Sequence, residues 1–295
     1  MTGERVLVTG GGGQLSSELE EALAGVAAEV HAPARAALDI TEEDAVAAVF
    51  ADFRPTVVFN CAAFHNVDVC EREEDRAFEV NARAVKRLAQ RCAEQGTRLV
   101  HMSTNYVFDG TAEAPYREDD LPSPKSIYAI SKLAGEYAAL AYAPGALVAR
   151  SAGLYGLFGS VSKGGNFVTR MLGRAREQGL LRVVVDQRLS PTFTSDLAAG
   201  LIEAVERGVT GVVHLTNGGA CSWHEFTETI MELAGVDVPV ERITTTRGPG
   251  EVDRPLNGVL AAAAAERAGL TPLRDWRDAL EDYMDRAGLL AAARA

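Results

Sequence analysis

The sequence predicts an α/β protein with a Rossmann-type, doubly wound parallel sheet and a smaller C-terminal α/β lobe. Three observations favour this fold class. A short apolar strand at residues 5–9 runs directly into a glycine-rich turn and a helix, which is the context that a dinucleotide fingerprint requires. Apolar strand-like runs then alternate with helical stretches through the first half of the chain, as in βαβ units. With 295 residues, the chain is long enough for one large domain and a second, smaller one.

The expected elements follow one another in a regular order. Strands are expected at residues 5–9, 28–32, 55–60, 98–104 and 146–150, with a long helix at 75–95 before the fourth of them. A strand at 181–185, a helix at 194–206 and a last strand at 212–215 are expected to return to the sheet. The remaining pattern predicts helices at 166–179, 222–233 and 276–286, and a glycine-rich mobile loop at 153–165. We therefore assign residues 1–150, with a return segment at about 181–215, to a dinucleotide-binding domain, and residues 151–180 and 216–295 to the smaller lobe.

Composition excludes several classes of protein. Acidic residues outnumber basic ones by 41 to 29, which gives a net charge of −12 and argues against nucleic acid or an anionic membrane surface as partner. No apolar run approaches the ~20 residues that span a bilayer, and the chain enters its first strand without a signal peptide. The 4 cysteines follow no metal-ligand spacing and are typical of a reducing compartment. We expect a cytoplasmic protein without a metal site.

A run of four glycines, residues 10–13, stands between the first strand and a helix. Glycine permits the tight turn and lets the backbone approach a pyrophosphate, which the positive end of the helix stabilises. Ser16 occupies the third small position of the fingerprint, where glycine is usual. A flexible loop is the alternative, but the placement between an apolar strand and a helix favours nucleotide binding.

The second strand is followed by no acidic residue that could hold a ribose 2′-hydroxyl until Asp39. Arg35 precedes it and can pair with a 2′-phosphate, which favours NADPH as cofactor, with NADH as the alternative. The alternative for Arg35 is a solvated surface side chain. Asp39 is placed to accept a hydrogen bond from an adenine amino group. A helix is expected to open at residues 39–41, with Thr41 and Asp44 in a capping box.

Tyr128 and Lys132 stand one turn apart in an expected helix. An ammonium beside a phenol favours the ionised form and lowers a tyrosine pKa from about 10 towards the working range. The chain has 25 arginines and only 4 lysines, so a lysine here suggests a need for a compact, titratable charge. A tyrosine tuned in this way can exchange a proton with a carbonyl or alcohol oxygen. The alternative is a surface helix that carries the two residues incidentally.

Other polar residues follow the strands. Ser103 and Thr104 form the polar end of the fourth strand, where a hydroxyl can hydrogen-bond the same oxygen that the tyrosine protonates. His65 is a candidate base or a loop hydrogen-bonder. Asn81, on the apolar stripe of the long helix, is either a satisfied core polar group or part of a proton relay. The arginines of the helix at 166–179 suggest a phosphorylated substrate, or simply a charged helix surface.

Several short motifs occur in order along nearly the whole chain. They lie at residues 9–15, 60–63, 80–82, 103–110, 128–136, 165–167, 186–187, 191–192, 222–226 and 254–255. In this combination the chain resembles the dTDP-4-dehydrorhamnose reductases, a family of extended short-chain dehydrogenase/reductases. The resemblance implies a Rossmann domain, a small substrate lobe, and NAD(P)H-dependent reduction of the 4-keto group of a nucleotide-linked deoxysugar.

The resemblance also implies roles for single residues. The implied catalytic set is Thr104, Tyr128 and Lys132. Cofactor contacts are implied for Gly10, Gly12, Gly13, Gln14, Leu15, Asp39, Ile40, Ala62, Ala63 and Phe64, together with Tyr128, Lys132 and the Arg35 discussed above. Substrate contacts are implied for Ser103, Thr104, Asn105, Gly153 and Asn166.

Three positions depart from the family pattern. Asn105 replaces an acidic residue, Ala129 replaces the glycine after the catalytic tyrosine, and Gly153 replaces a tryptophan. Because positions 105 and 153 face substrate in the family, the sugar and the product stereochemistry stay open between rhamnose and a natural-product deoxysugar. The alternatives in function are a non-catalytic NADP-binding regulatory subunit and a nucleotide-sugar epimerase or dehydratase. A dehydratase needs an added acid and base, where Asn105 and Tyr106 stand instead. A nucleotide sugar is the expected partner, and a homodimer is left open.

Overall fold

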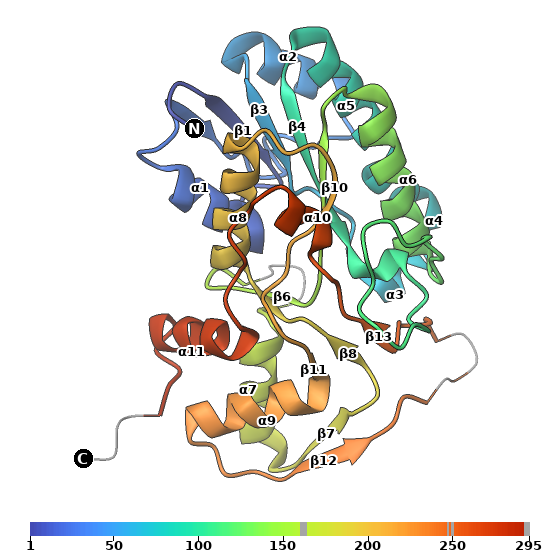
Figure 1. Ribbon diagram of the computed structural model, residues 1–295, viewed down its shortest axis with the longest axis vertical. Helices are drawn as coiled ribbons and strands as arrows, with labels where there is room; N and C mark the ends of the chain where they lie inside the picture. The colour runs from blue at the N-terminus through green and yellow to red at the C-terminus, as the bar shows by residue number, and fades with distance from the viewer. Residues whose placement is uncertain (160–163, 247, 249–250, 292–295) are drawn as a thin grey trace.

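The computed structural model describes residues 1–159, 164–246, 248 and 251–291 and contains the expected parallel sheet (Figure 1). The six strands of this central sheet are, in spatial order, β10 (Gly211–His214), β5 (Leu147–Ser151), β4 (Arg98–Thr104), β3 (Val57–Asn60), β1 (Arg5–Thr9) and β2 (Glu29–His31). Every neighbouring pair in it is parallel. The chain runs from β1 outward to β2 and then returns to β3 on the other side of β1. Such a reversal forms a crevice at the carboxyl ends of the strands, where open α/β sheets bind ligands.

Helices cover both faces of the central sheet (Figure 1). One face packs against α1 (Gln14–Leu23) and α8 (Thr194–Glu206), and the other against α2 (Glu43–Phe53), α5 (Ala84–Gln95) and α6 (Ile127–Tyr142). Alternate residues of β1 serve the two layers, since Val6 and Val8 join the α1–α8 core and Leu7 joins the opposite one. Burial on both faces explains why the strands are continuous apolar runs rather than alternating ones.

The remaining elements are short or belong to the smaller lobe. Those near the carboxyl edge of the sheet are α3 (Val67–Cys70), α4 (Glu74–Phe78), a π-helix η1 (Glu79–Arg83) and a 3₁₀ turn η2 (Asn105–Val107). The later ones are β6 (Leu154–Tyr155), α7 (Phe167–Gln178), β7 (Leu181–Val184), β8 (Arg188–Leu189), β9 (Thr192–Phe193), β11 (Cys221–Ser222), α9 (Trp223–Ala234), β12 (Val240–Ile243), β13 (Asn257–Gly258), α10 (Ala263–Arg267) and α11 (Trp276–Arg286). Among the described residues, no helix is long and apolar enough to cross a membrane.

The smaller lobe has its own apolar core, which lies below the central sheet in Figure 1. Aromatic side chains dominate it, and the Tyr155, Phe226 and Tyr283 side chains are almost fully buried. Of the return segment expected at 181–215, α8 packs on the central sheet and β10 forms its edge strand. In contrast, β7 pairs in parallel with β12, and its Leu181 lies in the aromatic core. Residues 181–184 therefore pack with the smaller lobe.

Two expected helices differ from the prediction. The helix expected at 75–95 is interrupted by η1, one wider π turn between α4 and α5. The helix expected to open at residues 39–41 begins at Glu43, because the Asp39 carboxylate accepts hydrogen bonds from the backbone and hydroxyl of Thr41 at 3.1 and 2.8 Å. This local turn replaces the expected capping box. In the expected loop at 153–165, residues 160–163 lie outside the described part of the chain, and residues 154–155 form β6.

Candidate active site

The glycine turn after β1 has the geometry that a dinucleotide requires. Gly10 and Gly12 have φ angles of +76° and +75°, which favour glycine. A Cβ on Gly11 would lie 2.2 Å from the carbonyl oxygen of Ala32, and one on Gly10 would lie 3.0 Å from the Cα of Ala62. The turn therefore lies against the backbone that follows both neighbouring strands. Its last residue, Gly13, is the N-cap of α1, whose free N–H groups favour an anion.

Ser16, the departure from the fingerprint, stabilises this turn. Its hydroxyl donates to the Gly10 carbonyl at 2.6 Å and accepts from the Gly13 N–H at 3.0 Å. The neighbouring Leu15 is buried in the core shared by α1 and α8. The predicted Gln14 begins α1. It lies close to the smaller lobe, since a Cβ added to Gly156 would be 3.4 Å from the Cγ of Gln14.

Several other predicted cofactor contacts also come together. Ile40, Ala62 and Phe64 share a small apolar cluster, although they follow different strands, and Ala63 lies between the last two. The Arg35 guanidinium pairs with the Asp39 carboxylate at 2.7 Å and keeps 59% of its side chain exposed. Burial raises the pKa of Asp39, but hydrogen bonds from Thr41 and Arg35 outweigh it and hold that pKa below its usual value. An exposed arginine at this edge fits a 2′-phosphate.

Two of the three predicted catalytic residues meet at the carboxyl edge of the sheet, and the third, Lys132, lies one turn further along α6. Thr104 ends β4, and its side chain hydrogen-bonds that of Tyr128, in the first turn of α6. The ring of Tyr106 lies edge-on to the Tyr128 ring, with centroids 5.9 Å apart. Ser126 caps α6 and accepts a hydrogen bond from the Ala129 N–H at 3.2 Å. The start of the helix, and hence Tyr128, is thereby fixed.

The expected effect of Lys132 on Tyr128 is wrong in this structure. Burial raises the pKa of Tyr128 above its ordinary value, and the hydrogen bond with Thr104 offsets only part of that rise. The ammonium of Lys132 instead donates to the backbone carbonyl of Met102 at 2.6 Å. Burial lowers the pKa of Lys132 to about 8. Tyr128 is therefore a protonated phenol at neutral pH, suited to give a proton rather than to take one.

Asn81 links the helix that carries Tyr128 to the loop after β3. Its side chain accepts from the Phe64 N–H at 2.8 Å and donates to the Phe64 carbonyl at 2.9 Å and to the Ser131 hydroxyl at 3.0 Å. Ser131 in turn donates to the carbonyl of Tyr128 at 2.8 Å. Of the two alternatives for Asn81, these bonds favour the satisfied core polar group. The π turn η1 aims this side chain, and π turns are frequent at functional sites.

The residues predicted to contact substrate have other partners here. Ser103 donates to the Glu136 carboxylate on α6, and the buried Asn166 caps α7 and donates to the Tyr283 hydroxyl at 2.7 Å. The buried Asn105 donates to the carbonyl of Gly258 at 3.2 Å and accepts from the Thr104 hydroxyl at 3.4 Å. Their contacts with substrate stay predictions. Asn105 ties β13 of the smaller lobe to the end of β4.

Gly153, where a tryptophan is usual in the family, has no room for a side chain in this backbone. Its φ is +56°, and a Cβ there would lie 2.5 Å from Cδ1 of Leu189. Leu189 pairs in register with Gly258, the residue that Asn105 holds. Two of the three departures from the family pattern are thus linked through the β8–β13 pairing: Gly153 packs on Leu189 of β8, and Asn105 bonds Gly258 of β13.

Two features beside Tyr128 were not predicted. Arg254, in the segment before β13, hydrogen-bonds the Tyr106 side chain and donates to both oxygens of Asp68 at 3.0 Å. The 254–255 motif is visible in the sequence, but its partners are more than a hundred residues away, so no local pattern identifies them. Glu71, just after α3, accepts a hydrogen bond from the Ile127 N–H at 2.7 Å. His65 lies with Nδ1 3.5 Å from the Ala63 carbonyl, a loop contact.

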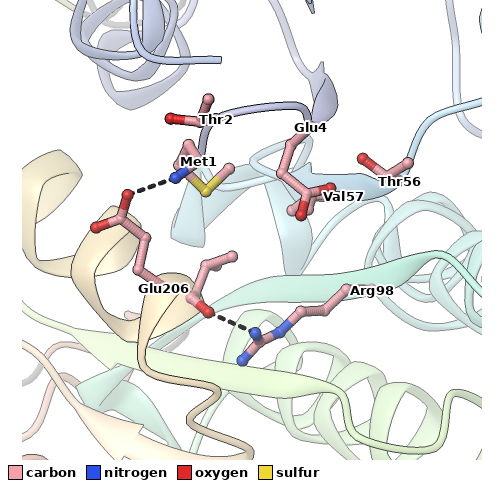
Figure 2. Close-up of a pocket in the computed structure, with 8 residues that line it drawn as sticks. Met1, Thr2, Glu4, Thr56, Val57, Arg98 and Glu206 are labelled. Atoms are coloured by element: carbon pink, nitrogen blue, oxygen red, sulfur yellow. Dashed lines mark hydrogen bonds and ion pairs between the residues drawn. The ribbon is translucent and has the colours of Figure 1, made fainter. Parts of the chain in front are cut away.

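A cavity of about 500 Å³ lies elsewhere, at the amino edge of the sheet. Figure 2 shows its lining, in which the Met1 amine contacts Glu206 and Arg98 donates to the carbonyl of Val205. Glu4 and Arg98 stand at the starts of strands, so this cavity is at the opposite edge from Thr104 and is unrelated to the site above. Among the described residues, no group of three or more His, Cys, Asp or Glu side chains is placed to hold a metal ion.

Comparisons with known proteins agree with the geometry. A family model described as the RmlD substrate binding domain matches residues 4–288. The spore coat polysaccharide biosynthesis protein SpsK of Bacillus subtilis is 40% identical over 280 residues, which cover 95% of this chain and 96% of that protein. A dTDP-4-dehydrorhamnose reductase of Mycolicibacterium smegmatis is 40% identical over 95% of this chain and 84% of its own length.

A solved structure is similar over the full fold. The dTDP-4-dehydrorhamnose reductase of Bacillus anthracis, in complex with NADP, superposes with a TM-score of 0.90 at 31% identity and covers 97% of this chain and 100% of its own. The family model and the sequence relatives span both the glycine turn and the smaller lobe. The chain therefore belongs to the family of dTDP-4-dehydrorhamnose reductases.

Proposed function

We propose that this protein uses NADPH to reduce the 4-keto group of a dTDP-linked 6-deoxyhexose, for rhamnose or a related deoxysugar. Two of the relatives named above, those of Mycolicibacterium smegmatis and Bacillus anthracis, are named dTDP-4-dehydrorhamnose reductase. One observation carries the proposal for this chain: the buried side chain of Thr104 interacts with the partly buried phenol of Tyr128 at the carboxyl edge of the sheet, one helical turn from Lys132. A regulatory subunit has no need to retain all three groups in this arrangement.

The chain's own residues fit NADPH. Gly10, Gly12 and Gly13 with the start of α1 would hold the pyrophosphate, since no side chain blocks the turn there. Arg35 would pair with the 2′-phosphate, and the cluster of Ile40, Ala62 and Phe64 would flank the adenosine. When bound, the reduced nicotinamide supplies the hydride.

The proton comes from the protein. Burial keeps Tyr128 protonated, so its hydroxyl donates to the carbonyl oxygen of the sugar as negative charge develops there. Thr104, which shares a hydrogen bond with that phenol, orients the same oxygen. Once the proton has left, Thr104 stabilises the phenolate, and the cation of Lys132, one turn further along α6, adds positive charge to this part of the site. Asn81 and Ser126 contribute by fixing α6, so that the phenol stays at the edge of the sheet.

We propose that positions 105 and 153 help to select the sugar, since Asn105 bonds the Gly258 carbonyl and Gly153 packs against Leu189, the residue paired with Gly258. A cytoplasmic location is a further part of this proposal and rests on the sequence alone.

Isotope transfer tests the proposed reaction. The protein is incubated with NADPH deuterated at the transferred position and with a dTDP-4-keto-6-deoxyhexose, and the sugar product is examined by NMR. We expect oxidation of NADPH and deuterium at C4. Tight NADPH binding without deuterium transfer to any dTDP-4-keto sugar would instead identify the regulatory subunit.

A further inference from the structure

Helix α6 carries a third polar side chain in line with Tyr128 and Lys132. Glu136 follows Lys132 by one turn, and both side chains are buried, with 1% and 3% of the residue exposed. The Glu136 carboxylate receives two hydrogen bonds from the Arg150 guanidinium, at 2.9 Å from Nε and 2.6 Å from Nη2, and one from the Ser103 hydroxyl. A phenol, an ammonium and a carboxylate thus follow one another along one face of the helix.

A buried ion pair of this kind needs an explanation beyond stability. Desolvation of two charges often costs as much as their attraction returns, and an apolar pair of similar volume would serve the core as well. Arg150 comes from β5 and Ser103 from β4, so two neighbouring strands both direct a donor at the same carboxylate. This arrangement fixes one negative charge on α6, one turn beyond Lys132.

The other groups around Lys132 bring no negative charge. From β4, His101 is neutral because burial and Lys132 lower its pKa well below the ordinary value. From the end of β3, burial raises the pKa of the Cys61 thiol to about 12, so it also stays neutral. The Met102 carbonyl contributes a dipole only. Arg150 is a cation and is paired with Glu136. Among the described groups that act on Lys132, Glu136 is the one carboxylate.

We propose that Glu136 is a positioning residue for the reaction, which keeps the buried Lys132 protonated so that α6 carries a cation one turn from Tyr128 during proton transfer. Arg150 and Ser103 hold the carboxylate in place for this purpose. The inference rests on the proposed role of Lys132 in the reduction. It assigns a supporting role to three residues next to the tyrosine–lysine pair: Ser103 on β4, Arg150 on β5 and Glu136 on α6.

The two halves of the ion pair have opposite expected effects on Lys132. In Glu136→Gln the carboxylate is lost and Arg150 becomes an uncompensated cation, so the pKa of Lys132 falls. In Arg150→Gln the carboxylate stays and faces Lys132 without its own partner, so the pKa of Lys132 does not fall and is expected to rise. A merely structural ion pair gives no such difference in sign, because each variant breaks the same contact.

Lysine NMR measures this directly in the cofactor-free protein. Since the chain has only 4 lysines, a sample labelled with ¹³Cε-lysine gives few signals, and Lys132→Arg assigns the relevant one. We expect the titration midpoint of Lys132 to fall by roughly one pH unit or more in Glu136→Gln, to stay or rise in Arg150→Gln, and to return near the wild-type value in Glu136→Asp. The proposal is overturned if Glu136→Gln leaves the midpoint unchanged or if both variants lower it.

A matched control removes another carboxylate from an ion pair. Asp196 pairs with Arg274 at 2.8 Å at the junction of the lobes, and Asp196→Asn is expected to leave the Lys132 midpoint unchanged.

In steady-state assays, the fall of kcat at alkaline pH should begin at lower pH in Glu136→Gln and not in Arg150→Gln. If Glu136→Gln does not fold, Arg150→Gln still decides the sign, because a lowered Lys132 midpoint in that variant overturns the proposal. Failure of the proposed reduction would show in the isotope experiment, whereas failure of this inference shows in the midpoint alone.

Discussion

Replacement of Gly135 by alanine tests how closely α6 is held against the rest of the site. A Cβ at this position would lie 2.1 Å from the backbone oxygen of Asn81 and 3.2 Å from Nε2 of His101. Alanine in a helix interior gains about 0.5–1 kcal/mol over glycine. Overpacking against backbone costs about 1–3 kcal/mol or more, and neither the π turn nor the buried histidine can move freely. We expect Gly135→Ala to lose about 1–3 kcal/mol of unfolding free energy in total.

Gly173 in α7 provides the matched control, because a Cβ there meets nothing within 4 Å. Gly173→Ala should therefore stabilise the protein by about 0.5–1 kcal/mol. Equilibrium urea unfolding of both variants, with equal m-values, measures the two effects with opposite signs. Gly135→Ala should also lower kcat, since a shift of α6 moves Tyr128 and Lys132. A Gly135→Ala protein as stable as wild type would refute the packing described for α6 and η1.

Three more predictions concern single residues of the site. Arg35→Ser should weaken NADPH binding by about 10-fold or more and leave NADH binding nearly unchanged, and fluorescence titration with both nucleotides checks this; equal losses would contradict it. Lys132→Met should abolish most activity yet raise stability at pH 7 by roughly 1–3 kcal/mol, because a buried ammonium whose pKa falls from 10.5 to about 8 destabilises the fold. Between those two pH values the unfolded chain keeps the lysine proton that the folded chain releases, so the stability of the wild type rises with pH. The stability gained by Lys132→Met should therefore shrink over this range. A gain that grows there would contradict the lowered pKa of Lys132. Asn105→Asp should cost about 1–3 kcal/mol in urea unfolding, because it places an acceptor against the Gly258 carbonyl, and an unchanged stability would show that this contact is not made.

Local patterns were enough for much of the fold and for the placement of Tyr128 and Lys132 on one helix. Short apolar runs identified all six strands of the central sheet, and the glycine run after β1 identified the turn, because both depend on a few adjacent residues. The spacing of Tyr128 and Lys132 placed them on one helix, and α6 begins one residue before Tyr128.

Long-range contacts explain what the sequence could not predict. The partner of β7 is β12, about 60 residues further along the chain, and nothing in residues 181–185 distinguishes that pairing from a place in the central sheet. The direction of the Tyr128 pKa depends on how deeply the fold buries the phenol, which spacing on a helix does not reveal. Glu136 stands at a helical spacing from Lys132 that was visible, whereas Arg150 on β5 was not recognisable as its partner.

Kinetics of Tyr128→Phe test the assigned chemistry most directly. Phenylalanine keeps the ring and its edge-on contact with Tyr106 and removes only the hydroxyl. We expect kcat for the dTDP-4-keto sugar to fall by about 100-fold or more, with the Kd for NADPH within about 2-fold of wild type. Undiminished turnover in Tyr128→Phe would contradict the role of this phenol as the proton donor.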